Sequence, residues 1–246
     1  PPSRRVAPTL APGVEHIVIF HLVTAGQATV RMEGMDDLVL APGDIVIIPH
    51  GDTHVVSNGN PAVIRDGSLS LANYQQGDLP TGVDGGGGEP TTFVCGYFGC
   101  ERQALRLFLS GLPRMLRINV RGDKAGAWLE SSICHLASET MSNRPGRTVL
   151  LSKMAEALFV EALRRHMADL PGDATGWLAA ARDPVVGAAL AAIHRSPADG
   201  WTLARIAAEA GASRSVVSQR FTALLGESPM AYVARWRLAR AARLLA

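Results

Sequence analysis

The chain has few cysteines and no long apolar run, and each of these shortages excludes a class of protein. Among its 246 residues are three cysteines, Cys95, Cys100 and Cys134. An odd number without framework spacing indicates a reducing compartment, where thiols stay free or bind metal. No apolar stretch approaches the roughly 20 residues that a membrane-spanning helix needs. No secretory signal is visible either, so we expect a cytoplasmic protein without a membrane partner.

The charge of the chain is small overall but unevenly distributed. The net charge is +2, and 47% of the residues are hydrophobic, enough for one large core or two smaller ones. Residues 1–100 hold four arginines and ten acidic residues, which gives −6. Residues 201–246 hold seven arginines, two glutamates and no lysine, which gives +5. This asymmetry indicates that one end faces a polyanion, although a codon bias and a solvated helix face produce the same count.

Short β-type runs separated by turns dominate the first half of the chain. Several such runs at regular spacing predict an antiparallel barrel or sandwich. The runs cover residues 15–23, 27–32, 37–40, 45–48, 54–57, 91–98 and 116–120.

Two helices are predicted after the strands, over residues 126–141 and 149–167. The second carries an apolar stripe that Phe159 and Val160 widen beyond what one neighbour covers. Such a face fits dimerisation between two copies of the chain. It fits equally well a helix that packs only against the barrel and the helix over 126–141.

Residues 202–221 have the pattern of a helix-turn-helix. Thr202 and Ser213 are suited to cap two short helices, and Gly211 marks the turn between them. The buried side of the second helix is expected to contain Val216, Val217, Phe221 and Leu224. The pattern predicts that this second helix enters a DNA major groove. An ordinary helical hairpin has the same caps and apolar faces.

Two segments resemble the AraC family of bacterial transcription regulators that carry a cupin-type sensor domain. Residues 177–194 with 201–203 resemble the entry into its DNA-binding domain, and residues 221–245 resemble the exit from its first helix-turn-helix into a connecting helix. The resemblance implies an α+β fold, with a cupin-like antiparallel β-barrel over 1–122, a helical dimerisation region over 123–170 and an all-α DNA-binding domain over 171–246. Family members have two helix-turn-helix units, and we expect this sequence to contain the first.

The resemblance places the exposed face of the second helix against the bases of double-stranded DNA. Arg214, Ser215, Ser218 and Gln219 lie on that face at helical spacing. Glutamine pairs with adenine and serine with either kind of base edge, whereas Arg214 suits a phosphate or a base equally. Arg220 and Arg205 fit phosphate contacts or solvated charges.

Residues 43–58 resemble the second cupin motif, in which a histidine after a Pro-x-Gly turn points into the barrel. This histidine is His54. The first motif is not recognisable, since His16 and His21 have the wrong spacing, and this puts the usual cupin metal site in doubt.

A different zinc site is predicted from two imidazoles and two thiols, since this donor set suits tetrahedral zinc. Its ligands are His50, His54, Cys95 and Cys100, with His21 as the alternative to His50. The competing interpretation is that His54 is a hydrogen-bonded core histidine and the cysteines are small buried hydrophobes. Cys134 is expected in the core.

These patterns together predict a homodimeric transcription regulator rather than an enzyme. Its cupin domain is expected to sense a small molecule or a metal, and the apolar interior favours an uncharged or hydrophobic effector. The first alternative is a metal-dependent cupin enzyme, a dioxygenase or isomerase, which needs the missing first motif. The second is a scaffold that dimerises without binding DNA.

Overall fold

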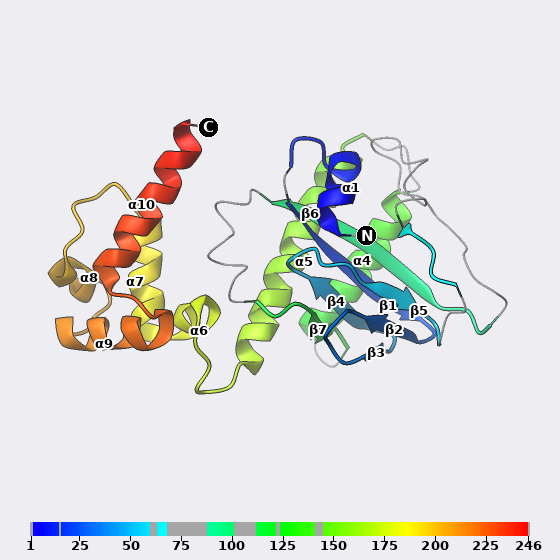
Figure 1. The fold of residues 1–246 in the computed structure, drawn as a ribbon, viewed down its shortest axis with the longest axis horizontal. Helices are drawn as coiled ribbons and strands as arrows, with labels where there is room; N and C mark the ends of the chain where they lie inside the picture. Colours follow the sequence, from blue (N-terminus) through cyan, green and yellow to red (C-terminus); the bar gives the residue numbers. More distant parts are fainter. Residues whose placement is uncertain are drawn as a thin grey trace. The chain divides into compact units, whose positions relative to one another are not determined.

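The computed structural model describes residues 2–14, 16–59, 63–67, 88–100, 112–121, 124–140 and 145–245, a few of them by their backbone alone. The chain forms two compact units, Pro1–Glu101 with Pro113–Arg165 and Arg102–Leu112 with His166–Ala246. The first contains the strands and the second contains helices α6 to α10 (Figure 1). The boundary between the units therefore falls inside helix α5.

The described strands of the first unit form two antiparallel sheets. The larger has the strand order β6-β1-β4-β7, and the smaller has the order β3-β2-β5. The strands are β1 (His16–Ala25), β2 (Ala28–Arg31), β3 (Leu38–Leu40), β4 (Asp44–Ile48), β5 (Val55–Ser57), β6 (Thr92–Cys100) and β7 (Leu116–Asn119). Each corresponds to a predicted run, and the predicted α+β fold, with antiparallel strands first and helices after them, is confirmed.

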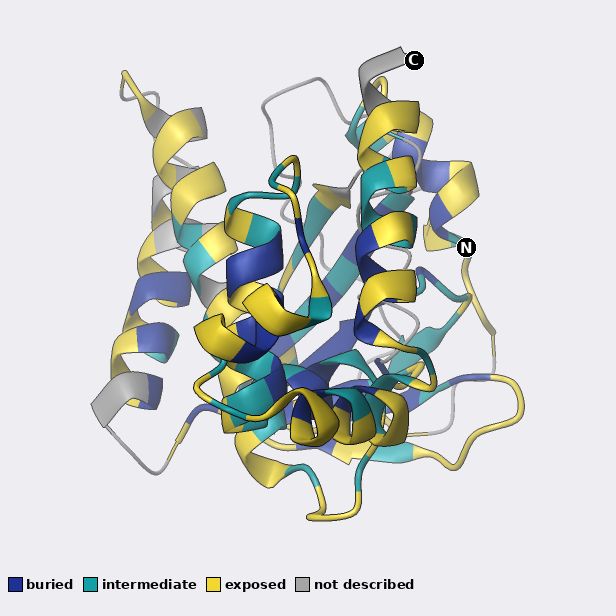
Figure 2. Ribbon diagram, turned by 90° about the vertical axis from the view of Figure 1, so that its left-hand side faces the viewer, coloured by how far each residue is buried: buried dark blue, intermediate teal, exposed yellow. Residues whose placement is uncertain are grey.

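Strand β1 pairs along both of its edges, and because successive side chains of a strand point to opposite faces of the sheet, its residues contact two different layers. On one side, Val23 joins a cluster with Val46 and Ile48 of β4 and with residues of the smaller sheet. We call this side the inner face. Strand β4 is buried along its whole length and β1 along half of it, whereas β5 and β6 are half-buried or exposed, and the outward sides of the helices are exposed (Figure 2).

The opposite side of the larger sheet faces α4 (Lys124–Thr140) and α5 (Arg147–Asp169). Phe20 of β1 stacks on Phe98 of β6 with ring centroids 5.3 Å apart, and Phe98 lies 5.1 Å from the ring of Phe159 on α5. Gly96 leaves room for this stack, because a Cβ there would lie 2.3 Å from the Phe20 ring. These aromatic contacts fix α5 on the sheet.

Asp44 is a fully buried carboxylate at the start of β4. It accepts hydrogen bonds from the Ala41 N–H (2.8 Å), the Asn119 side chain (2.8 Å) and Arg117 (2.9 Å). Desolvation raises the pKa of Asp44, but these hydrogen bonds outweigh it and leave the pKa below its ordinary value. The network thereby holds the ends of β4 and β7 together.

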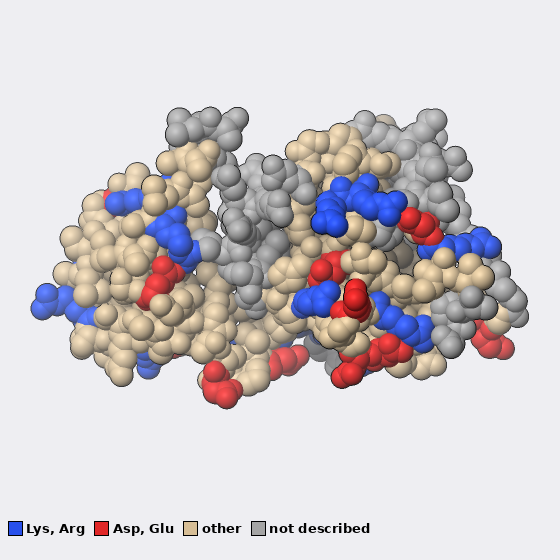
Figure 3. Space-filling model, in the orientation of Figure 1, with Lys and Arg blue, Asp and Glu red and all other residues tan. Residues whose placement is uncertain are grey.

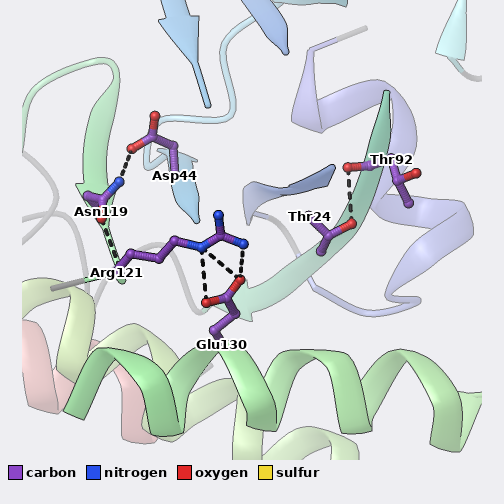
Figure 4. Close-up of polar contacts among 6 residues, drawn as sticks. All are labelled: Thr24, Asp44, Thr92, Asn119, Arg121 and Glu130. Carbon is purple, nitrogen blue, oxygen red and sulfur yellow. Dashed lines mark hydrogen bonds and ion pairs between the residues drawn. The ribbon is translucent and has the colours of Figure 1, made fainter. Parts of the chain in front are cut away.

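The same network reaches helix α4. The Asn119 side-chain oxygen accepts a hydrogen bond from the Arg121 N–H at 2.8 Å. The Arg121 guanidinium forms an ion pair with Glu130 of α4 at 2.7 Å (Figure 4). Elsewhere in the sheet, near the end of β1, the Thr24 hydroxyl donates a hydrogen bond to the carbonyl of Thr92 on β6, 3.2 Å away. Polar contacts of this kind set the register of the sheet and join it to its covering helix.

A short helix, α1 (Ser3–Leu10), was not predicted from the sequence. Val6 and Ala7 pack on Ile17 of β1, and the Ser3 N–H donates to the Gly51 carbonyl at 2.7 Å. The apolar residues Val6, Ala7 and Leu10 recur at helical spacing, but a helix of eight residues that contains a proline is unstable alone, so tertiary contacts stabilise it.

The second unit is built from five helices around one apolar core. They are α6 (Trp177–Arg182), α7 (Pro184–Arg195), α8 (Leu203–Glu209), α9 (Arg214–Leu225) and α10 (Pro229–Leu245). Phe221 of α9 and Tyr232 of α10 are fully buried and meet edge to face, with centroids 5.9 Å apart. His194 of α7 stacks on Trp236 at 4.3 Å, and burial lowers its pKa. This core fixes α9 against α7 and α10.

One expected core residue of α9 is exposed instead. Val217 and Phe221 are fully buried, but 37% of Val216 is accessible to solvent. The reason is helical geometry: Val217, Phe221 and Leu224, at positions i, i+4 and i+7, form the buried face, and Val216 lies about 100° around the helix from Val217. The prediction that Val216 is buried was therefore wrong. Cys134, expected in the core, is also exposed.

We expect Asp44→Ala to lower the free energy of unfolding by about 2–3 kcal/mol, because three donors lose their buried acceptor. Urea denaturation at pH 7 measures this loss. The difference from wild type should shrink as the pH falls below the ordinary carboxyl pKa of 3.8 and through the lowered pKa of the folded state. Glu156→Ala, which removes an exposed acceptor of Lys153 and Ser152, is the control and should cost less than about 0.5 kcal/mol. An equal effect of the two substitutions would contradict the role given to Asp44.

Candidate functional site

Helices α8 and α9 are joined by the predicted tight turn. The Thr202 hydroxyl accepts a hydrogen bond from the Arg205 N–H (3.2 Å), and the Ser213 hydroxyl accepts one from the Val216 N–H (3.3 Å). Gly211 has φ +60°, a backbone conformation that side chains other than glycine rarely adopt. Both predicted caps and the predicted turn are confirmed, and the two helices form a helix-turn-helix.

The outer side of α9 presents a short polar surface. Arg214, Ser215 and Gln219 are exposed, and Ser218 is half-buried. The exposed Val216 lies among them, so the surface also offers one apolar contact. We call these five residues the α9 face. Sequence reasoning left Val216 out because a valine at helical spacing is usually assigned to the core.

Most of the described arginines of the helix-turn-helix region and α10 are bound within the unit itself. The pairs are Arg205 with Asp199, Arg220 with Asp183, Arg235 with Glu227, and Arg237 with the carbonyls of Pro197 and Asp199. Arg214 and Arg240 are exposed, and within the described part of the chain they make no hydrogen bond or ion pair. On the face drawn in Figure 3, the basic side chains of this unit are spread out rather than merged into one patch.

Arg220 is tied to the beginning of α7. One oxygen of Asp183 caps α7 by accepting the N–H groups of Val185 (2.9 Å) and Val186 (2.8 Å). The other oxygen accepts from the Arg220 guanidinium at 2.8 Å. Arg220 thus joins α9 to α7. Asp183 and Asp199 precede residue 201, so the sequence count of charges did not include these two neutralising partners.

A second candidate site lies on the inner face of the first unit, where His21, His54 and Cys95 form a hydrogen-bonded chain. Residues His21 of β1 and Cys95 of β6 are opposite each other in the register. The Nδ1 atom of His21 lies 2.9 Å from the Cys95 sulfur, and its Nε2 lies 2.8 Å from Nε2 of His54. The Nδ1 of His54 lies 2.9 Å from the carbonyl oxygen of Asp52.

The chain of contacts fixes where the protons lie. A carbonyl only accepts hydrogen bonds, so Nδ1 of His54 carries the proton and its Nε2 is an acceptor. The Nε2–H of His21 must then donate to His54, which leaves the His21 Nδ1 lone pair facing the Cys95 thiol. This tautomer assignment follows from the hydrogen-bond pattern.

The three side chains are uncharged at neutral pH. The pKa of His21 is lowered to about 3, mainly by desolvation and to a lesser extent by the neighbouring His54. Desolvation also lowers the pKa of His54. Cys95 keeps exposed surface, yet desolvation of its sulfur raises the pKa of the thiol to about 12. The cluster is therefore made of neutral donors and acceptors.

The structure brings together only part of the predicted zinc set. Among the described residues, no group of three or more His, Cys, Asp or Glu is arranged around one ion. Cys100 lies five positions from Cys95 along β6, ~16 Å away at the usual strand rise, and its side chain lies outside the described residues. His21, rather than His50, contacts His54. Zinc binding by His50, His54, Cys95 and Cys100 stays a prediction, and the register argues against both cysteines holding one ion.

Comparisons with known proteins place both units in families. Residues 4–168 match the cupin family, and residues 193–234 match the bacterial regulatory helix-turn-helix proteins of the AraC family. An AraC-like transcription regulator of Streptomyces lividans is 30% identical over 231 residues, which cover 93% of this chain and 74% of that protein. The regulator AlkR of Acinetobacter baylyi is 30% identical over 234 residues, covering 93% and 75%. The crystal structure of the AraC-like activator CuxR aligns with a TM-score of 0.36 and 12% identity, covering 92% and 67%.

We expect Asp183→Asn and Arg220→Ala each to lower the free energy of unfolding by about 0.5 kcal/mol, because each breaks the exposed ion pair and keeps the cap. Asp183→Ala should cost about 1 kcal/mol more, because it also removes the cap of α7. Denaturation followed by tryptophan fluorescence measures these differences. The double variant with Asp183→Asn and Arg220→Ala should be no less stable than either single variant. Additive losses would show that the two side chains are not coupled.

Proposed function

The chain belongs to the AraC family of bacterial transcription regulators and carries a cupin domain ahead of its helix-turn-helix, and on this premise we propose that α9 reads the DNA major groove while the cupin domain senses an effector. The observation that carries the first part is the α9 face. It is the exposed side of a capped helix whose opposite side is locked into the core by Val217 and Phe221.

The chemistry of the α9 face suits base edges. Gln219 pairs with adenine, and Ser215 and Ser218 accept from or donate to either kind of edge. Val216 adds an apolar surface of the kind that contacts a thymine methyl group. Arg214 stands at the first turn of α9, where it reaches a phosphate or a guanine. The face therefore combines hydrogen-bonding and apolar recognition.

The division of the arginines supports separate roles in binding. Arg214 and Arg240 have exposed guanidinium groups available for phosphates. Arg220 is a positioning residue, because its ion pair with Asp183 holds α9 on α7. Because its guanidinium is already engaged by Asp183, Arg220 suits this structural role better than the predicted phosphate contact.

A sensing role for the cupin domain is supported by the relatives and by the fold. The matched relatives are named as transcription regulators, which favours a regulator over the cupin-enzyme alternative. Phe20, Phe98 and Phe159 border an apolar pocket between the larger sheet and its two helices. This pocket has a volume of about 10 Å³, room for about one water molecule, and is therefore too small to hold an effector as it stands.

A homodimer is supported by apolar side chains on the outside of α5. Val149 and Val160 are 66% and 48% exposed. They are 11 residues apart, about three helical turns, so they lie on one side of the helix. We propose that this side of α5 meets a second copy of the chain.

In the described part of the chain, no helix is long and apolar enough to span a membrane.

We expect Arg214→Ala to weaken binding to a duplex selected from a random-sequence pool. If Arg214 neutralises a phosphate, the slope of log affinity against log salt should fall by about 0.9. If it reads a base, the slope should hold, and discrimination at one position should drop by about 1–3 kcal/mol. Fluorescence anisotropy at several salt concentrations separates the two cases.

Arg220→Ala is the matched control, because it removes the same charge from the same helix. It should leave the salt slope unchanged and lower stability instead. A fall in slope equal to that of Arg214→Ala would contradict the positioning role. If neither Arg214→Ala nor Gln219→Ala alters affinity or sequence preference, α9 is not the recognition helix.

For the dimer, we expect Val160→Glu to shift the chain toward monomer in sedimentation velocity, because a buried unpaired carboxylate is costly at an apolar interface. Val63→Glu is the matched control, since Val63 is 74% exposed on a loop. It should leave the sedimentation coefficient unchanged. A Val160→Glu variant that sediments like the wild-type dimer would rule out this side of α5.

A further inference from the structure

The contacts of His21 resemble those of a metal-ligating histidine with its supporting partner. Its Nδ1 lone pair faces the Cys95 sulfur, and its Nε2–H is held by His54. His54 in turn is fixed by the backbone carbonyl of Asp52. Histidine ligands usually donate their other ring N–H to such a partner, which sets the tautomer and the ring orientation. Two donor atoms are thus aimed at one point, and the second imidazole lies behind the first.

We propose that Cys95 and His21 bind one monovalent, thiophilic metal ion such as Cu⁺, with His54 orienting His21 from behind. The ion takes the place of the thiol proton, between the sulfur and Nδ1. The sulfur–nitrogen distance must then widen from the 2.9 Å of the protonated pair. We expect the exposed Cys95 side chain to make this movement, so that the contacts of His21 Nε2 and of His54 are kept.

The number of ligands favours a monovalent ion. Soft thiolate ligands select Cu⁺, which accepts two or three ligands, whereas zinc sites in proteins are nearly always four-coordinate. Cys95 and His21 supply two, and the described residues near them contribute no further group arranged around the same point. Turning the His21 ring so that His54 also became a ligand would break the contact between the two imidazoles.

The charge of the site also favours a monovalent ion. A thiolate, a neutral imidazole and a monovalent cation sum to zero, so binding leaves no net charge in a desolvated place. A divalent ion would leave one positive charge there, and an uncompensated buried charge is costly. The nearest described carboxylate along the chain, Asp52, is engaged by Arg114 at 3.0 Å. Cys95 has exposed surface, which gives an ion access to the sulfur.

The binding step is a proton-for-metal exchange without electron transfer. The Cys95 S–H bond breaks, a sulfur–metal bond forms, and the proton leaves to solvent. His21 gives its Nδ1 lone pair to the ion and keeps its Nε2 proton. The inference deepens the sensing role proposed above, and it is tested by binding alone. Failure of metal binding is therefore distinguishable from failure of DNA recognition.

The experiment uses the full chain without a polyhistidine tag. Under anaerobic conditions, Cu⁺ is delivered from a chromophoric chelator, and Ag⁺ serves as a redox-inert substitute. We expect about one ion per chain, with loss of binding in Cys95→Ser and His21→Gln. His54→Gln should bind about 10–100-fold more weakly, as loss of a supporting partner does. Cys134→Ser, which removes the other described free thiol, is the control and should bind like wild type.

Imidazole nitrogen NMR provides a readout that does not depend on the stability of the variants. On addition of Ag⁺ to the wild-type chain, the Nδ1 resonance of His21 should shift strongly, while Nδ1 of His54 should keep its proton. No competition with the chelator, or unchanged binding in Cys95→Ser, would overturn the proposal. Tighter binding of Zn²⁺ than of Cu⁺ through the same residues would overturn the monovalent assignment. A strong shift of both His54 nitrogens would make His54 a ligand and overturn its supporting role.

Discussion

The alternation of side chains along strand β1 is the constraint on which the first unit depends. Because β1 pairs with β4 on one side and β6 on the other, it has no free edge, and a shift of one residue would exchange its two faces. In the observed register, Phe20 meets the aromatic side chains under α5, and Val23 meets the inner cluster. A slipped register would put the ring of Phe20 on the inner face and His21 under the helices. The packing of apolar residues thus determines where the polar chemistry lies.

In the second unit, ion-pair partners within the protein determine which of its arginines remain available for other contacts. The segment from residue 201 looks strongly basic when its residues are counted alone. In the folded unit, Asp183 and Asp199 lie against Arg220 and Arg205, and Glu227 lies against Arg235. The apolar core positions the helices, and these pairs occupy the guanidinium groups on its surface. A net charge read from sequence is therefore a poor guide to the number of phosphates that the unit can neutralise.

Local features of the sequence predicted much of this structure, because each depends on few residues. The strands follow from period-two runs, and the starts of α8 and α9 from Thr202 and Ser213. Features that depend on tertiary packing were missed, such as the helix α1. The exposure of Val216 was also missed, because its apolar side chain was weighed above its position about 100° around the helix from Val217. The helix-turn-helix was predictable because its parts are neighbours in the chain, whereas the predicted zinc ligands come from separate segments whose arrangement depends on strand pairing.

The histidine–cysteine cluster shows that spacing in the sequence identifies candidate donor atoms better than it predicts how they are arranged in space. His54 and Cys95 were both predicted as ligands, and His21 stood only as an alternative. What decides among the histidines is the pairing of β1 with β6, which sets His21 opposite Cys95. The same pairing puts Cys100 opposite His16, at the far end of the strand. A four-ligand site drawn from these residues would need two distant strand positions to converge, which an unbroken ladder prevents. A site of low coordination number, supported by a second imidazole, is what an unbroken ladder allows.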